Sequence, residues 1–178
     1  MKLWKRLFIS TIATATFVAM FPSPSGSTET ATSGGKTKSS TKCWDYKGGE
    51  RGFFSRINNA RSNNGVTSLH LDKHLSKAAR RHSWEMVNKE SLYHTPDDKL
   101  RRRVTNWTIL GENVGVGGSV ESLHEAFMNS PAHKANIIYT PFKHVGIGTN
   151  WDDGRLWVTV IFEATTNPGT RLSMPSCN

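Results

Sequence analysis

The sequence predicts an α+β domain that follows an export signal and a linker. Apolar residues recur at helical spacing between about residues 50 and 138, and two β-branched and aromatic runs follow between residues 145 and 162. Helices followed by strands that a short turn connects are typical of an α+β fold with an antiparallel sheet. At 178 residues the chain is long enough for one such domain.

Residues 1–25 have the parts of a secretory signal. Three basic residues give a positive start, an apolar run covers residues 7–21, and proline, serine and glycine follow. We therefore expect export and a secreted or extracellular location. A retained membrane anchor is the alternative, although the run is shorter than the roughly 20 residues that span a bilayer. Removal of the segment would lower the formal net charge from +9 to +6.

Residues 26–42 consist mainly of serine, threonine, glycine and lysine. We expect a flexible linker here, because this composition cannot bury enough apolar surface to offset its ordering entropy. The folded domain is expected to cover residues 43–178. Cys43 and Cys177 stand at its two ends, and such a pair tends to form a disulfide outside the cytoplasm. Two free thiols are the alternative.

Two helices are predicted in the first half of the domain. The first should end at Asn63-Asn64-Gly65. The second should begin after Asp72, whose carboxylate can cap it, and end near Lys89. His82 falls on the apolar face of the second helix, and we interpret it as a core histidine rather than a ligand. The apolar positions of the first helix are Phe53, Phe54, Ile57 and Ala60.

Two further helices are predicted after a Gly-Gly pair. Ser119 should cap the third helix and Ser130 the fourth, which should end near Ile138. Pro131 suits the first position of the fourth helix, where a missing N–H has no consequence. The capping bond would occupy the Ser130 hydroxyl. The apolar stripe of the third helix consists of Val120, Leu123 and Phe127.

The last third of the domain has the period of β-strands. Residues 145–151 and 156–162 are rich in β-branched and aromatic side chains, and Asp152-Asp153-Gly154 between them is a hairpin signal. We therefore expect two antiparallel strands that this turn connects.

Four segments contain polar residues that an apolar core does not require. They are Leu92–Thr95, Gly111–Val114, Phe127–Ile137 and His144–Gly148. In this order and spacing they resemble the bacterial branch of the CAP superfamily, which also contains cysteine-rich secretory proteins, insect venom antigen 5 and plant pathogenesis-related proteins. The resemblance covers about residues 50–165. It implies a three-layer α-β-α sandwich with a central antiparallel sheet.

The resemblance also implies a cavity with two histidines and two acidic residues. By position, His94 matches the first histidine, Glu112 the glutamate of the Gly-Glu-Asn motif, and His133 the second histidine. The fourth position departs from the eukaryotic pattern, because Phe127 is followed three residues later by Ser130 and not by glutamate. A mechanism that needs two carboxylates is therefore in doubt.

The matching residues suggest three roles. His94, Glu112 and His133 are the catalytic candidates, and Asn113 and Ser130 are the binding candidates. His94 and His133 are also candidate ligands of a divalent ion such as zinc, because neutral imidazoles bind such ions and a helix N-terminus favours the neutral form of His133. The alternative is a hydrogen-bond network that only satisfies polar groups.

Two neighbouring features are excluded from this cavity. Glu125 stands two residues from Phe127, which is about 200° around a helix, so we expect it to face solvent. His124-Glu125 begins like the zinc-protease pattern H-E-x-x-H, but Met128 occupies the last position and the motif fails.

The densest positive stretch is Lys99-Leu100-Arg101-Arg102-Arg103, with Lys73, Arg80 and Arg81 elsewhere in the sequence. It suits an anionic cell-surface polymer or lipid headgroups, and the alternative is a solvated face. We expect no nucleic-acid partner, because no binding motif accompanies the charge. For the four scattered tryptophans, core packing or strand pairing is expected. They are Trp84, Trp107, Trp151 and Trp157.

The sequence therefore predicts an exported, monomeric binding module for a lipid, glycan or peptide at or outside the cell surface. The alternative is a metal-assisted hydrolase, in which His94 and His133 bind the ion and Glu112 activates water. The missing second carboxylate argues against the hydrolase. Whether the protein is an enzyme stays open at this point.

Overall fold

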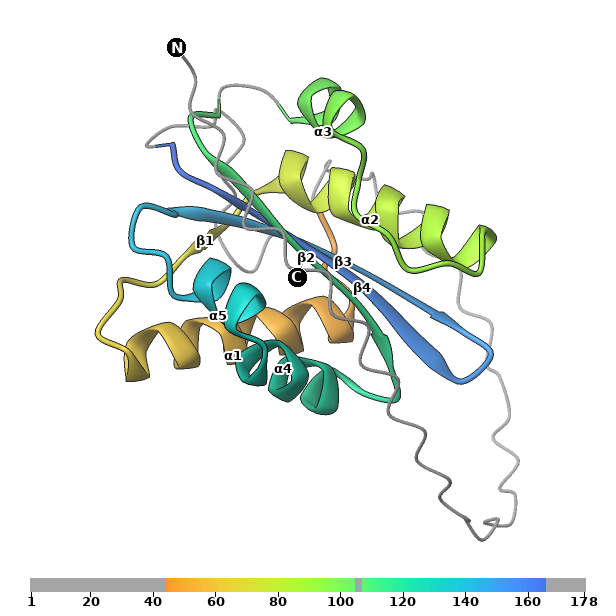
Figure 1. Ribbon diagram of the computed structural model, residues 1–178, viewed down its shortest axis with the longest axis horizontal. Coiled ribbons are helices and arrows are strands. Elements are labelled where there is room, and N and C mark those ends of the chain that lie inside the picture. The colour runs from red at the N-terminus through yellow and green to blue at the C-terminus, as the bar shows by residue number, and fades with distance from the viewer. Residues whose placement is uncertain (1–43, 105–106, 166–178) are drawn as a thin grey trace, which may run out of the picture.

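The computed structural model describes residues 44–104 and 107–165, and within them the helices and strands form three layers (Figure 1). The predicted signal (1–25), the linker (26–42) and the Cys43–Cys177 pair lie outside the described residues. None of the described helices is long and apolar enough to cross a membrane. The elements are α1 (Gly48–Asn63), β1 (His70–Leu71), α2 (Lys73–Asn88), α3 (Asp97–Arg103), β2 (Leu110–Gly117), α4 (Val120–Asn129), α5 (Pro131–Ile137), β3 (His144–Asp152) and β4 (Arg155–Glu163).

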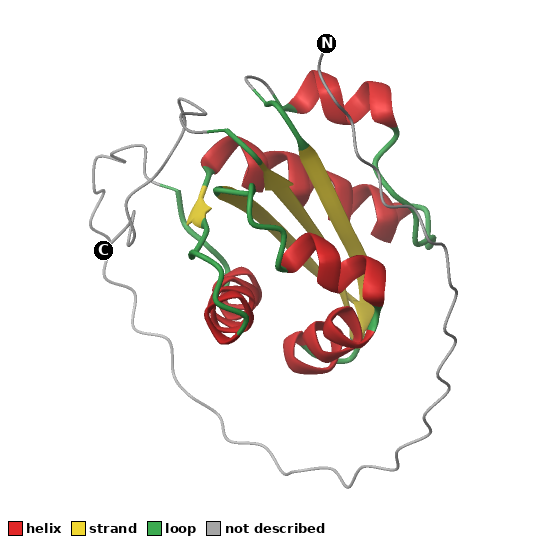
Figure 2. Ribbon diagram, turned by 60° about the vertical axis from the view of Figure 1, so that its left-hand side comes forward, coloured by secondary structure: helices red, strands yellow, loops and turns green. Residues whose placement is uncertain are grey.

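A four-stranded sheet with the order β1-β3-β4-β2 forms the middle layer. β4 pairs antiparallel with both β3 and β2, and the two-residue β1 pairs parallel with β3. Helix α2, with α3 beside it, covers one face, and α1, α4 and α5 cover the other (Figures 1 and 2). The predicted α-β-α sandwich with its mainly antiparallel sheet is confirmed.

The predicted hairpin between β3 and β4 is confirmed. Asp152 pairs with Arg155, so the loop has two residues. Both of them have positive φ, 45° at Asp153 and 67° at Gly154. This conformation gives the right-handed twist that tight hairpins need, and Asp-Gly adopts it readily.

The contact between α2 and β3 is unusually close. A Cβ atom at Gly146 would lie 2.1 Å from the Leu75 carbonyl carbon, and one at Gly148 would lie 2.1 Å from the Arg80 backbone nitrogen. The backbone of α2 therefore rests directly on β3, with no side chain between them. Ser83 strengthens the contact, because its hydroxyl donates to the Gly148 carbonyl oxygen at 2.7 Å.

Arg61 connects the layer of α1, α4 and α5 internally. Its side chain is fully buried, and its guanidinium donates to four carbonyl oxygens, which belong to Thr67, Ile137, Tyr139 and Phe142. Burial lowers the pKa of this guanidinium from its ordinary value. These bonds join α1 to the end of α5 and to the connection that leads into β3.

The four helices predicted from periodicity are present, and Asp72 and Ser119 accept the capping hydrogen bonds expected of them. His82 is fully buried, as predicted, and its Nε2 lies 2.7 Å from the Tyr93 carbonyl oxygen. The sequence did not reveal β1, β2 or α3. β1 is two residues long, β2 has three glycines in place of an alternating pattern, and α3 is a highly charged helix of seven residues.

The expectation for the tryptophans is wrong for Trp84. This residue lies on the outer side of α2 with 59% of its surface exposed. Trp151 is equally exposed, although it lies in β3 and pairs with Leu156. Trp157 is buried, and Trp107 packs against a cluster of buried apolar residues, as expected. Exposure of Trp84 follows from the direct contact of α2 with β3, which leaves the opposite side of the helix to solvent.

Glu163 is a fully buried carboxyl group at the end of β4. It lies opposite His144 of β3 and Leu110 of β2. Among the described residues neither carboxyl oxygen has a hydrogen-bond partner. Burial, with the nearby negative charge of Asp72 as a smaller cause, raises the pKa of Glu163 to about 8. The group is therefore mainly protonated at neutral pH.

The contact of α2 with β3 predicts a strong effect of one added methyl group. Gly148→Ala should lower the free energy of unfolding by more than about 3 kcal/mol, because the new Cβ collides with helix backbone that cannot move alone. Gly118→Ala is the matched control and should change it by less than about 0.5 kcal/mol, because no atom lies within 4 Å of its Cβ position. Urea denaturation measures both. Equal stability of the two variants would contradict this packing.

Glu163 predicts a pH dependence of stability. A carboxyl group whose pKa is higher in the folded than in the unfolded protein destabilises the fold as pH rises from about 4.5 toward 8. Glu163→Gln removes this ionisation, so the melting temperature of the variant should exceed that of the wild type more at pH 8 than at pH 5. Each unit of pKa difference corresponds to about 1.4 kcal/mol. If the melting temperature of Glu163→Gln exceeds that of the wild type equally at pH 5 and at pH 8, the raised pKa of Glu163 is contradicted.

Candidate functional site

Glu112 holds the segment that contains His94. Glu112 lies in β2, and its side chain is only 6% exposed. One carboxylate oxygen accepts hydrogen bonds from His94 Nδ1 at 2.9 Å and from the Thr95 backbone N–H at 2.8 Å. The other accepts from the Thr95 hydroxyl at 2.6 Å. The bond to Glu112 uses Nδ1 of His94.

His133 lies in the first turn of α5 and is half-buried. Its ring packs on Phe127 with 5.0 Å between the centroids. Burial, and to a smaller extent the positive charge of His94, lower the pKa of His133. The direction agrees with the expected one, and burial is its largest cause. The influence of His94 shows that the two imidazoles lie within electrostatic reach of each other.

Asn113 holds α5 against β2. Its side chain is fully buried, its amide nitrogen donates to the His133 carbonyl oxygen at 3.0 Å, and its amide oxygen accepts from Asn136 at 2.9 Å. Asn136 also donates to the Glu112 carbonyl oxygen at 3.3 Å. The amide of Asn113 therefore serves internal contacts and positions the backbone of His133.

The glycine before Glu112 permits this close packing. A Cβ atom at Gly111 would lie 2.8 Å from the Phe142 ring and 3.0 Å from the Asn136 amide oxygen. The Gly-Glu-Asn motif thus has three separate duties. Gly111 admits α5, Glu112 holds His94, and Asn113 holds His133.

β2 is an edge strand, and its residues hold the segments of both histidines. Neighbouring residues on a strand point to opposite faces, so Glu112 points toward the layer of α2 and α3 and Asn113 toward the layer of α5. Glu112 fixes a histidine from the connection that follows α2, and Asn113 fixes a histidine from α5. The candidate site therefore lies where the two helical layers meet around one edge of the sheet.

The expectation for the Ser130 hydroxyl is wrong. Ser130 is the N-cap residue of α5 by position, but its side chain makes no capping hydrogen bond. Its backbone N–H instead donates to the Ala126 carbonyl oxygen at the end of α4. Ser130 thus ends one helix and begins the next, and its backbone conformation serves both. Glu125 is exposed, as predicted.

The residues at the site supply few ligands for a metal ion. Among the described residues no three His, Cys, Asp or Glu side chains are grouped so that they could hold one. Both oxygens of Glu112 are engaged by the His94–Thr95 segment. Catalytic zinc sites use three protein ligands. The two histidines are therefore one ligand short, and only donor atoms from a bound molecule or water would complete such a site.

Two residues of the site were not predicted. Thr95 and Asn136 make hydrogen bonds that fix Glu112 and Asn113, respectively. Both stand within the four motif segments, Thr95 directly after His94 and Asn136 one helical turn after His133. Each stands on the same loop or helix as a candidate histidine, and this proximity could have identified both residues from the sequence.

The basic residues divide into structural and solvent-facing groups. Arg80 forms two 2.6 Å contacts with the buried Glu50, and Arg103 pairs with Glu85. These two arginines therefore stabilise the fold. Lys77, Arg81 and Lys89 remain on the outer surface of α2 or directly after it, in the neighbourhood of Trp84.

Comparison with known proteins identifies relatives of this chain. Residues 54–162 match the CAP family, which is described as the cysteine-rich secretory protein family. The uncharacterized protein YkwD of Bacillus subtilis is 30% identical over 115 residues, which are 61% of this chain and 44% of that protein. The chain thus spans less than half of this relative's length.

Solved structures have the same fold. An outer surface protein of Borrelia burgdorferi has a TM-score of 0.62 and 20% identity, over 70% of this chain and 98% of that one. A structure of NaASP2 with Zn²⁺ has a TM-score of 0.53 and 12% identity, over 67% of this chain and 83% of that one. The family match includes Glu112, both histidines and every described strand except the last residue of β4. The chain therefore belongs to the CAP, or cysteine-rich secretory protein, family.

Proposed function

We propose that this protein is an exported binding module that captures a lipid, glycan or peptide at or outside the cell surface, through the edge of β2 where His94 and His133 meet. The observation that carries the proposal is the set of hydrogen bonds that the Glu112 carboxylate accepts. Its carboxylate accepts three hydrogen bonds from His94 and Thr95. We therefore assign Glu112 as a positioning residue that keeps His94 in place for a ligand.

The same observation disfavours the alternative, a metal-assisted hydrolase. A general base must be within hydrogen-bond reach of the proton that it removes, and Glu112 is directed to the segment that it supports. Ser130 has no activating partner either, because no hydrogen bond joins it to His133 in the part of the chain that the structure describes. The geometry thus favours binding over bond cleavage.

A divalent ion is compatible with this proposal as an auxiliary. His94 and His133 would hold it, and the ion would attract electronegative donor atoms of the captured molecule. The lowered pKa of His133 favours the neutral imidazole that an ion requires. A related fold has been solved with Zn²⁺, which gives a reason to choose zinc as the probe.

The outer surface of α2 suits a partner at the cell surface. Lys77 and Arg81 stand seven and three residues before Trp84, so the three side chains share one side of the helix. An exposed tryptophan flanked by cations suits an anionic polymer or lipid headgroups, because the ring binds at an interface and the cations attract phosphate or carboxylate.

The positioning role of Glu112 predicts a large loss of stability on its removal. Glu112→Ala should lower the free energy of unfolding by about 2–4 kcal/mol, because His94 Nδ1, the Thr95 N–H and the Thr95 hydroxyl all lose their acceptor. The amide signal of Thr95 in a ¹H–¹⁵N NMR spectrum should move upfield as its hydrogen bond is lost. Urea denaturation and NMR provide the two measurements.

Glu125→Ala is the control for Glu112→Ala, because Glu125 is an exposed carboxylate of α4, and it should change stability by less than about 0.5 kcal/mol. A Glu112→Ala protein with wild-type stability and an unmoved Thr95 signal would overturn the positioning role. Glu112 would then be free to act in catalysis.

The two-histidine pair predicts a pH-dependent effect of zinc. Added zinc should raise the melting temperature at pH 7.5 and have little effect at pH 5, because both imidazoles must be neutral to bind the ion and protons compete with it at acidic pH. His133→Ala should fold and lose the zinc effect, whereas Glu125→Ala should keep it. Thermal denaturation with and without zinc measures this. If zinc does not stabilise the wild type in a pH-dependent way, the proposed ion is ruled out. The proposed binding module then stands without an ion.

A further inference from the structure

The outer side of α2 is a stripe of exposed residues, which we call the α2 outer face. Its members recur every three or four positions along the helix, and they lie opposite the side whose backbone rests on β3. Figures 1 and 2 show α2 on the outside of the sheet, with α3 beside it. The members are His74, Lys77, Arg81, Trp84 and Asn88.

Trp84 is the large apolar side chain of this face. It is 59% exposed, although tryptophan is on average highly buried in folded proteins. Leu92, in the connection that leads from α2 to α3, is 48% exposed. Among the described residues the third exposed large apolar side chain is Trp151. Two of the three therefore lie between residues 84 and 92, where a partner that removed them from water would gain free energy.

Cations precede Trp84 on the same side of the helix. Lys77 and Arg81 are both exposed. Arg81 lies 3.3 Å from Glu85, but the Glu85 side chain is only 15% exposed and also pairs with Arg103. The negative charge of Glu85 is therefore largely used inside the protein, and the α2 outer face presents positive charge beside an exposed indole ring.

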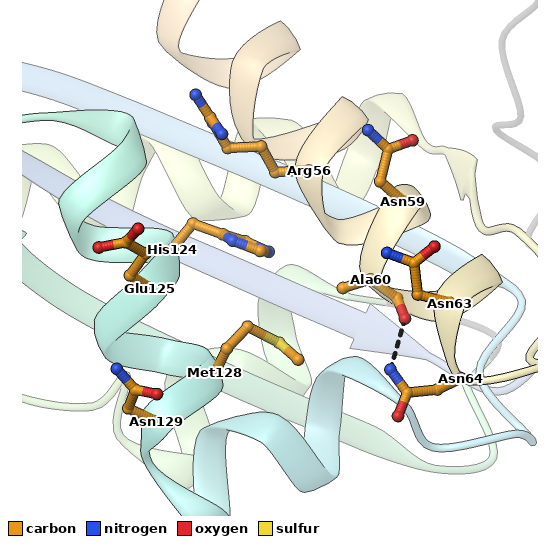
Figure 3. Close-up of a pocket in the computed structure, with 9 residues that line it drawn as sticks. All are labelled: Arg56, Asn59, Ala60, Asn63, Asn64, His124, Glu125, Met128 and Asn129. Atoms are coloured by element: carbon orange, nitrogen blue, oxygen red, sulfur yellow. Dashed lines mark hydrogen bonds between the residues drawn. The ribbon is translucent and has the colours of Figure 1, made fainter.

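The two helical layers differ in charge. Helices α2 and α3 together contain eight Lys or Arg and three Asp or Glu residues, whereas α1, α4 and α5 contain four and three. In the second layer Arg56 pairs with Glu121 at 3.5 Å, and Figure 3 shows Arg56 and Glu125 on α1 and α4, which face each other. An anionic surface would therefore attract the protein with the α2 outer face foremost.

We propose that the α2 outer face docks the protein on an anionic lipid bilayer, with Trp84 among the headgroups and Lys77 and Arg81 against the lipid phosphates. The inference rests on the proposed function for its location at the cell surface, and it names the partner of this helix. Tryptophan prefers the boundary between headgroups and acyl chains, because its ring is apolar and its N–H can donate. Each cation near an anionic membrane adds to the attraction.

A bilayer accounts for both kinds of side chain on this face. A soluble anionic polymer would pair with Lys77 and Arg81 but would offer Trp84 little apolar surface. A second copy of this chain would bring two positively charged faces together, which is unfavourable. Anionic lipid places negative headgroups directly above an apolar layer, so that one surface satisfies the cations and the ring.

The test is cosedimentation of the exported protein, purified from the medium of a producing bacterium, with lipid vesicles. Phosphatidylcholine vesicles with about 30% phosphatidylglycerol should bind it at least about tenfold more tightly than pure phosphatidylcholine. Salt at about 0.5 M should weaken this binding, because it screens the charges. Brominated acyl chains should quench the tryptophan emission of the wild type and should quench that of Trp84→Ala much less.

Two variants remove the two parts of the docking surface. Trp84→Ala should weaken binding to anionic vesicles about tenfold, because the apolar anchor is lost. Lys77→Gln/Arg81→Gln should also weaken it about tenfold, because two attractions to the headgroups are lost. Both variants should keep the circular dichroism spectrum of the wild type, since all three side chains are exposed on a helix.

Each variant has a matched control. Trp151→Ala removes a tryptophan that is also 59% exposed, but strand alternation turns Trp151 to the face of the sheet opposite to Gly146, Gly148 and α2. Lys134→Gln/Lys143→Gln removes two positive charges from α5 and from the connection before β3. Both controls should change binding by less than about twofold, because they leave the α2 outer face intact.

This proposal and the function proposed for His94 and His133 can fail separately. The Thr95 amide signal and the zinc-dependent melting temperature report on the edge of β2, and both are measured without vesicles. If they behave as predicted while anionic vesicles bind no better than neutral ones, the docking surface alone is wrong.

Two further results would overturn the docking surface. One is that Trp84→Ala binds anionic vesicles as tightly as Trp151→Ala. The other is that polyphosphate binds the wild type while anionic vesicles do not, which would assign the cations to a soluble polymer. A dimer that forms without vesicles and that Trp84→Ala abolishes would also contradict the proposal, because a second copy of the chain would then cover the face.

Discussion

The close contact of α2 with β3 is the constraint on which the rest of the fold depends. Gly146 and Gly148 leave no space for a side chain, so the helix backbone lies directly on the sheet. This contact fixes the height and direction of α2 above the strands. It also fixes the connection that follows α2, which contains His94, and it turns the opposite side of the helix, with Trp84, toward solvent. The position of α2 on one face of the sandwich therefore depends on glycine at positions 146 and 148.

The opposite face is organised by polar contacts. Arg61 binds four backbone carbonyl groups and so joins α1, α5 and the connection before β3 without a carboxylate partner among the described residues. Hydrogen bonds from Asn113 and Asn136 then attach α5 to β2. Because the Arg61 and Asn113 side chains are fully buried, loss of these bonds would leave unsatisfied groups, which is unfavourable. His133 is therefore held on a rigid support, although it lies in a helix of only seven residues.

Two histidines are held by neighbouring residues of β2, because a single edge strand serves both layers. Glu112 and Asn113 are neighbours in β2 and point to opposite faces, yet each fixes a segment that reaches around the free edge. This arrangement explains why the carboxylate is fully engaged inside the protein. It favours a preorganised surface for capture of a ligand.

The sequence by itself determined the helices with clear periodicity, the Asp-Gly hairpin and the family, because these depend on local spacing or on motifs. It did not determine β2, whose glycines suppress the alternation that identifies a strand, nor the charged helix α3. The duties of Glu112, Asn113 and Ser130 were decided only by the tertiary structure. A hydrogen-bond partner depends on which segments meet in space, and Thr95, His133 and Asn136 reach β2 from distant parts of the chain.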